Sequence, residues 1–213
     1  NTFISALLFR LGNVKKNIGY NREGRGFLLD FSPEINYHKH YINRYAFLFN
    51  EYIGNKYVYL PELSLRYTGQ KTFQFDNSHK TIALYLGGEN KEFRKYPDEY
   101  AVQLLRLLNR QGYNLLLIGD ENDNIKHTQY AEEARIDHLI NLTARTTIEG
   151  FINTIANVDL IITIDSSALH IAAAVKTPFI ALMGLSTSPT STILPKVPLG
   201  RILKIENNLI REE

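Results

Sequence analysis

The sequence contains no cysteine, so both a disulfide scaffold and a thiolate metal site are excluded. An excess of one charge sign is also lacking: 24 Lys and Arg stand against 22 Asp and Glu, for a formal net charge of +2. That balance does not give the concentrated basic field of a nucleic-acid-binding protein. No apolar run approaches the roughly 20 residues of a membrane-spanning helix, and no signal peptide is visible at Asn1. We therefore expect a cytoplasmic protein without a nucleic-acid partner.

The sequence contains two regions that differ in composition and hydrophobic pattern. Residues 1–76 are rich in Tyr, Asn and charged side chains, whereas residues 77–213 alternate apolar strands with amphipathic helices. We expect two domains with these bounds. In the first region the pattern predicts helices over 3–11 and 42–52, short strands over 17–20 and 26–29, and a domain connection over 54–79.

The second region predicts a doubly wound, Rossmann-like parallel sheet, and hence the α/β fold class. Its strands are nearly continuous apolar runs, as in a sheet that helices cover on both faces. Pro97 is expected at the first position of one helix, and Thr146 with Glu149 is expected to form the capping box of another. The expected strands are 81–86, 114–118, 139–142, 160–164, 179–183 and 202–205, and the other expected helices are 125–135 and 167–175.

In an open α/β sheet, ligands bind beyond the carboxyl ends of the strands. The most suggestive loop there runs from Asp165 to His170, directly after the apolar strand 160–164. Ser166 or Ser167 can cap the following helix, whose N-terminus forms an anion site. Asp165 can accept hydrogen bonds from sugar hydroxyls, and His170 falls in the first helical turn. A capped helix with a structural Asp and a hydrogen-bonded His explains the same residues equally well.

Two further loops leave the same edge of the predicted sheet. In the first, Gly87 and Gly88 allow close backbone approach to a ligand, and Arg94 and Lys95 can meet phosphate oxygens. A solvated basic turn is the alternative. In the second, residues 119–124 offer carboxylates to ribose hydroxyls, or form an ordinary polar turn that caps the next helix.

Other chemistries have less support. His38 and His40 lack a third metal ligand, and a solvated loop accounts for them better than a metal site. The sequence has neither a G-x-S-x-G nucleophile elbow nor a G-x-G-x-x-G dinucleotide fingerprint. We expect no metal and no cofactor.

Taken in order, these segments resemble glycosyltransferase family 9, the ADP-heptose:lipopolysaccharide heptosyltransferases with the two-domain GT-B fold. The most specific part is the Asp-Ser-x-x-x-His-x-Ala-Ala block that begins at Asp165. The other matching segments are 21–26, 86–88, 94–97, 117–119, 141–143 and 177–184.

The resemblance implies a role for each matching residue. Asp165 matches a donor-contacting Asp, and Arg94 falls where the family usually has a Lys at the donor phosphate. Either Asp123 or Glu121 falls where the family has a Glu near the donor ribose. The phosphate-proximal positions are Ser166, Ser167 and His170, and the glycines that approach the donor are Gly87 and Gly88. Ser186-Thr187 lies where the family has a Gly-Pro-Thr-Asp type of loop.

The resemblance also implies that the start of the fold, with the catalytic base, precedes Asn1. Residues 1–76 are then a remnant of the N-terminal, acceptor-side domain, and residues 77–213 are the C-terminal donor domain. We expect this chain to bind a nucleotide sugar weakly and to transfer it poorly or not at all.

The activity that the resemblance implies is an inverting transfer. An ADP-heptose-like nucleotide-diphosphate sugar is the expected donor, and a lipopolysaccharide core or lipid A hydroxyl is the expected acceptor. Peripheral association with the cytoplasmic face of the inner membrane follows from that acceptor. A non-catalytic nucleotide-sugar-binding module and another GT-B enzyme, such as a UDP-sugar epimerase, are the alternatives.

Overall fold

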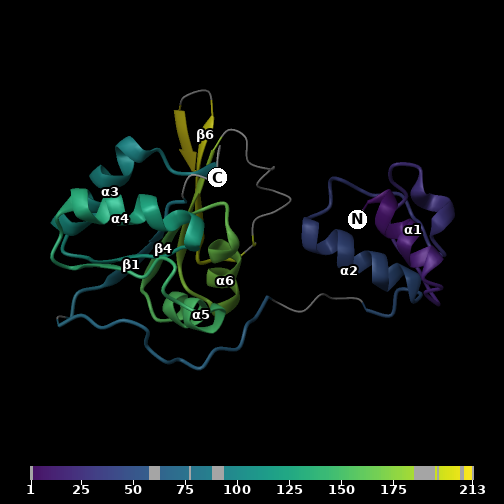
Figure 1. The fold of residues 1–213 in the computed structure, drawn as a ribbon, viewed down its shortest axis with the longest axis horizontal. Coiled ribbons are helices and arrows are strands. Elements are labelled where there is room, and N and C mark those ends of the chain that lie inside the picture. Colours follow the sequence, from purple (N-terminus) through teal and green to yellow (C-terminus); the bar gives the residue numbers. More distant parts are fainter. Residues whose placement is uncertain are drawn as a thin grey trace. The chain divides into compact units, whose positions relative to one another are not determined.

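The computed structural model describes residues 2–57, 63–76, 78–87, 94–184, 195, 197–206 and 209–212. The chain divides into two compact units between residues 62 and 63. In Figure 1 the first unit is coloured purple to blue and the second blue to yellow.

The first unit contains two α-helices where the hydrophobic pattern predicts them. The strand expected over 26–29 is wrong, because a 3-10 helix occupies this stretch. Glu23 (φ 54°) and Gly24 (φ 70°) are both left-handed, so the backbone turns tightly where an extended strand would have to begin. The other expected strand, 17–20, does not form as a strand: only Ile18 pairs, in a single parallel bridge to Phe31. The elements are α1 (Phe3–Leu11), η1 (Arg25–Leu28) and α2 (Tyr41–Tyr52).

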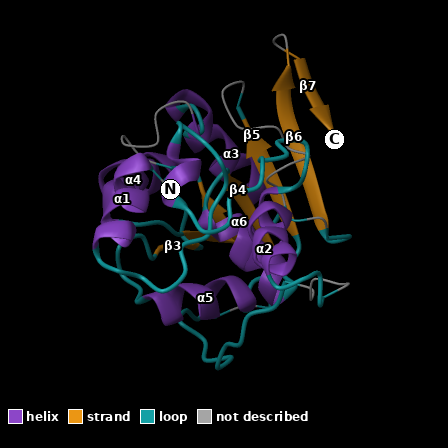
Figure 2. Ribbon diagram, turned by 90° about the vertical axis from the view of Figure 1, so that its right-hand side faces the viewer, coloured by secondary structure: helices purple, strands orange, loops and turns teal. Residues whose placement is uncertain are grey.

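The second unit is built on a sheet with the strand order β3-β2-β1-β4-β5-β6-β7 among the described residues. Every neighbouring pair from β3 to β6 is parallel, which confirms the expected α/β fold. At one edge β7 pairs antiparallel with β6, as Figure 2 shows, and this strand lies beyond those that the sequence predicts. The strands are β1 (Thr81–Tyr85), β2 (Asn114–Leu117), β3 (Leu139–Asn141), β4 (Leu160–Ile164), β5 (Phe179–Met183), β6 (Gly200–Glu206) and β7 (Leu209–Glu212).

Helices cover both faces of this sheet, with β1 and β4 running between the two layers (Figure 1). Successive residues of a strand point to opposite faces. On β1, Ile82 and Leu84 accordingly pack with α3 and α4, whereas Ala83 and Tyr85 pack with α5 and α6. All four side chains are buried. The helices are α3 (Asp98–Arg110), η3 (Glu121–Asp123), α4 (Asn124–Ala134), α5 (Ile148–Ala156) and α6 (Ser167–Val175).

Two helices begin one residue later than the sequence predicts. Pro97 is the N-cap of α3 instead of its first helical residue. The capping box expected between Thr146 and Glu149 is wrong, because Thr147 caps α5 by accepting a 3.1 Å hydrogen bond from the N–H of Gly150. Two adjacent threonines offer the same capping group, and the structure uses the second, so that Glu149 falls at the second helical position.

Residues 63–76 form no helix or strand, yet they pack against the second unit. Asn153 of α5 accepts a hydrogen bond from the N–H of Gly69 (3.1 Å). Phe73 and Phe75 rest on the hydrophobic core between the sheet and the layer formed by α5 and α6. The division between the units therefore falls before this segment, whereas the sequence predicts a domain boundary after it.

Candidate functional site

A pocket of about 540 Å³ lies at the carboxyl ends of β1, β2 and β3. This is the edge at which ligands bind in open α/β sheets. One wall is the turn that follows β2, the other is the segment that leads from β3 into α5, and α6 begins at the pocket. The lining residues are Tyr85, Gly119, Asp120, Glu121, Ala144, Thr146, Thr147, Ile148, Phe151, Ser167 and Ile171.

The N-terminus of α6 brings helix dipole and hydroxyl groups to the pocket. Ser166 is the N-cap: its Oγ accepts a 3.3 Å hydrogen bond from the N–H of Ala168, and a 3.0 Å bond joins it to Thr163 Oγ1. Ser167 is the first helical residue, is exposed and lines the pocket. The first N–H groups of a helix and its positive dipole end attract anions. The pocket can therefore receive a phosphate group beside Ser167.

Arg94 and Asp165 meet at the same end of the sheet. The Arg94 Nη1 donates to the backbone oxygen of Asp165 at 3.5 Å, and the Arg94 side chain is exposed. Gly87 follows β1, which pairs with the strand before Asp165, and has a left-handed φ of 78°. Gly88 lies outside the described residues. Lys95 faces elsewhere, because its Nζ forms an ion pair with Asp98 at 3.2 Å.

His170 lies one helical turn into α6 and is half-buried, but it is not among the residues that line the pocket. The structure thus brings Arg94, Asp165, Ser166 and Ser167 together after β4. Of these four residues only Ser167 lines the pocket, and Arg94 lines a different pocket. Ser186-Thr187 lies outside the described residues.

The two candidates for the ribose-binding carboxylate occupy different environments. Glu121 is exposed and lines the pocket. Asp123, which we expected at the donor, is instead completely buried, and its Oδ2 accepts a 3.0 Å hydrogen bond from the N–H of Asp120. The reason is local: η3 turns Asp123 inward beneath Gly119. The geometry favours Glu121 of the two.

Burial sets the protonation of the groups beneath the pocket. Burial raises the pKa of the Tyr85 phenol, and the carboxylates of Asp123 and Asp120 raise it further, so this side chain stays neutral and donates to Asp120 Oδ2 at 3.5 Å. Burial lowers the pKa of His127 to about 4, an effect that Asp123 and Asp120 only partly offset. The imidazole is therefore neutral at physiological pH.

Several pocket residues are not found by sequence reasoning. Tyr85 and Phe151 form part of the floor, with their rings 6.3 Å apart in an edge-on arrangement. Ala144 and Thr146 belong to a wall. A signal was available for the wall, because the segment after β3 leaves the carboxyl ends of the strands, as do the three loops that carry the candidate residues.

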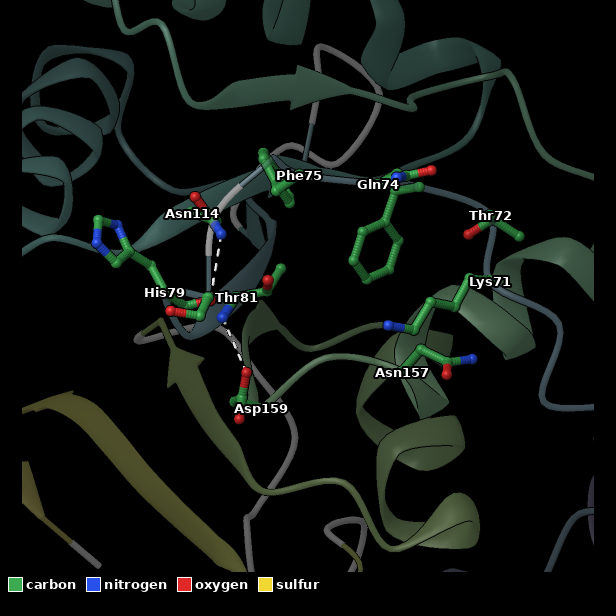
Figure 3. Close-up of a pocket in the computed structure, with 11 residues that line it drawn as sticks. Lys71, Thr72, Gln74, Phe75, His79, Thr81, Asn114, Asn157 and Asp159 are labelled. Carbon is green, nitrogen blue, oxygen red and sulfur yellow. Dashed lines mark hydrogen bonds between the residues drawn. The ribbon is translucent and has the colours of Figure 1, made fainter.

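A second pocket, of about 840 Å³, lies at the amino ends of the strands (Figure 3). Thr81 and Asn114 begin their strands there, and Asp159 immediately precedes β4. Its polar groups bond to the protein itself: Asp159 Oδ2 accepts from the N–H of Thr81 (2.9 Å), and Asn114 Nδ2 donates to the His79 oxygen (3.2 Å). We therefore place the candidate site in the first pocket, at the carboxyl ends of the strands.

Neither a cluster of metal-ligating side chains nor a membrane-spanning helix is found in the part of the chain that the structure describes. No three His, Asp or Glu side chains gather there as a set of metal ligands. Each helix in that part is too short or too polar to traverse a bilayer.

The architecture is that of one class of enzyme structures, the GT-B heptosyltransferases. The structure of E. coli ADP-heptose lps heptosyltransferase II matches with a TM-score of 0.78 and 22% identity, covering 97% of this chain and 67% of that one. E. coli heptosyltransferase WaaC with ADP-2-deoxy-2-fluoro heptose matches with a TM-score of 0.68 and 18% identity, covering 97% and 64%.

The chain belongs to glycosyltransferase family 9 (heptosyltransferase), whose model matches residues 1–208. Among curated relatives, lipooligosaccharide heptosyltransferase 2 of Haemophilus influenzae is 34% identical over 130 residues, which is 59% of this chain and 37% of the relative. Lipopolysaccharide heptosyltransferase 2 of Salmonella typhimurium is 23% identical over 209 residues, or 88% and 58%. The chain thus spans between about a third and three fifths of the length of these relatives.

Proposed function

We propose that the protein is a glycosyltransferase of heptosyltransferase type that acts in lipopolysaccharide biosynthesis. Its donor would be an ADP-heptose-like sugar, and its acceptor a hydroxyl of the lipopolysaccharide core. Family membership supports the reaction class. The names of the relatives support the acceptor, and the two E. coli structures support an adenine nucleotide donor. The enzyme would act in the cytoplasm, at the membrane face where its acceptor is made.

The second unit would bind the donor. The diphosphate would lie against the N-terminus of α6 at Ser167, where fixed N–H groups face negative charge without reorganising. Arg94 would add a cationic partner and Asp165 an acceptor for sugar hydroxyls. Glu121 would accept hydrogen bonds from the ribose, and the aromatic floor would contact the base. This assignment proposes a donor domain over residues 77–213 and an acceptor-side region before it, with residues 63–76 packed against the donor domain.

Inverting transfer would proceed by attack of the acceptor oxygen on the anomeric carbon. The bond from that carbon to the diphosphate oxygen breaks, ADP leaves with the electron pair, and a base takes the acceptor proton. The dipole of α6 and Arg94 would stabilise the charge on the departing diphosphate. We assign no described residue as the base.

The observation that carries the proposal is the position of Ser167, which both begins α6 and lines the pocket. Ser167→Asp tests it by charge. An acidic residue in the first helical turn stabilises the helix, but it would repel a diphosphate at the same place. We expect the ADP dissociation constant from calorimetry to rise about tenfold or more, with a melting temperature that is unchanged or slightly higher.

Gln103→Glu is the matched control. It adds the same single negative charge on the exposed side of α3, away from the pocket, and should leave ADP affinity unchanged. Equal affinity of Ser167→Asp and the wild type would refute this location for the diphosphate. Transfer from ADP-heptose to a lipopolysaccharide core lacking heptose tests the reaction itself. Donor binding without transfer would favour the non-catalytic binding module.

A further inference from the structure

Two polar side chains behind the pocket are completely buried: Asp123, the residue before α4, and His127, in the first turn of α4. Asp123 and His127 are four residues apart, the spacing that places two side chains on one face of a helix. Each has 0% exposure. Neither lines the pocket, and neither has a role in the proposed transfer.

Asp123 fixes the wall formed by the turn after β2. Its Oδ2 accepts the N–H of Asp120 at 3.0 Å, in the middle of that wall. Its carboxylate also lies against Gly119, where an added Cβ would fall 2.7 Å from the same oxygen. Gly119 is therefore required for close approach and not for a left-handed backbone. The position of the wall depends on this contact.

His127 fixes the opposite wall. Its Nδ1 forms a 2.8 Å hydrogen bond with Thr143 Oγ1, which is itself completely buried. The next residue, Ala144, lines the pocket in a left-handed conformation (φ 60°). The N–H of Ala144 then donates to the oxygen of Gly119 at 3.2 Å, so the two walls are also bonded to each other. Asp123 at the N-cap of α4 and His127 in its first turn thus hold both sides of the pocket.

We propose that Asp123 and His127 are positioning residues, which hold the two walls at the separation that the nucleotide donor requires. This inference rests on the proposed function for its ligand, whereas the bracing of the walls can be measured without one.

The hydrogen bonding of the pair supports a positioning role over simple stabilisation. Among the described residues, Asp123 Oδ1 and His127 Nε2 have no hydrogen-bond partner although both are buried. Unpaired buried polar atoms reduce stability, so an apolar pair would serve the core better. What an apolar pair would lack is the directed bonds to Asp120 and Thr143 that place the walls.

Thr143→Val tests the inference with a minimal change, since it removes the hydroxyl and keeps the shape. We expect faster amide hydrogen exchange at Glu121 and Ala144 in the free protein, and a three- to tenfold weaker affinity for ADP by calorimetry. Thr177→Val is the matched control: Thr177 is also buried and its hydroxyl also makes one 2.8 Å bond, to the Ile155 oxygen, away from the pocket. It should change neither readout.

A pair of substitutions at His127 separates position from packing. His127→Asn places an amide near the Nδ1 position and should retain exchange protection and ADP affinity, whereas His127→Leu should lose both. Equal exchange at the two walls in Thr143→Val, His127→Leu and the wild type would overturn the inference. So would faster exchange with unchanged ADP affinity. If the wild type binds no ADP, the proposed function fails, and the exchange data alone decide whether the walls are braced.

Discussion

The buried histidine behind the pocket should give the protein a specific dependence of stability on pH. Its pKa falls from an ordinary value of 6.5 to about 4 because burial disfavours the imidazolium. Unfolding exposes His127, which then binds a proton at any pH between these two values. The folded state therefore binds fewer protons than the unfolded state, and stability is lost as pH falls from about 6.5 to about 4.

The size of the effect follows from the two pKa values. Between about pH 7 and about pH 4.5, this one group should reduce the free energy of unfolding by about 2 kcal/mol. The carboxylates of Asp123 and Asp120 attract the imidazolium and raise the pKa of His127, and the value of about 4 already contains this effect. Staying above about pH 4.5 also avoids most of the titration of ordinary carboxyl groups.

Urea unfolding followed by circular dichroism measures the effect. The wild type should lose about 2 kcal/mol more than His127→Asn on going from about pH 7 to about pH 4.5. His138→Asn, which replaces an exposed histidine, should behave like the wild type. Identical pH dependence of the wild type and His127→Asn would show that the imidazole is not buried neutral, and the reasoning would be refuted.

Three further predictions concern other parts of the second unit. Asp165→Ala should weaken ADP-sugar binding about tenfold in calorimetry without lowering the melting temperature, because its position after β4 suits a ligand contact; a large loss of thermal stability would instead assign it to the core. Gly200→Ala should destabilise the protein by about 2 kcal/mol or more in urea unfolding, because the added Cβ would lie 2.2 Å from the Phe179 ring; an unchanged midpoint would contradict this packing. The Asp98 carboxyl is partly buried, which raises its pKa, but hydrogen bonds from Tyr130, Lys126 and Lys95 outweigh burial and lower the pKa to about 2. Stability from this group is present above about pH 4 and lost as pH falls towards 2, so Tyr130→Phe should show a smaller loss in acid unfolding, and an equal loss would count against the hydrogen bond.

Much of the parallel sheet is predictable because its central strands are buried on both faces. Leu160–Ile164 and Phe179–Met183 are continuous apolar runs, and the structure gives both strands the predicted bounds. The helix Ser167–Val175 is likewise predicted residue for residue. Edge elements are different. Leu209–Glu212 is only four residues long and pairs on one side, so its sequence carries too little pattern to identify it.

The candidate site is predictable only where the backbone alone decides it. Asp165 and Ser167 follow a buried strand and open a helix, so topology places them at the carboxyl edge of the sheet. The choice between Glu121 and Asp123 depends on a single 3-10 turn that rotates one carboxylate inward, and composition carries no trace of it. Phe151 has the spacing of a core residue on its helix, and only the tertiary arrangement exposes its ring to the pocket.

The floor of the pocket belongs to the hydrophobic core itself. Tyr85 is 3% exposed and packs within the cluster that joins the sheet to α5 and α6, while Phe151 rests on that cluster and meets the Tyr85 ring edge-on. Any replacement that reshaped the floor would also disturb the packing of the sheet against α5. The two walls are turns, and they do not pack the sheet against α5. In proteins that share this architecture, changes of donor preference should therefore accumulate in the turns after β2 and β3, while the floor stays constant.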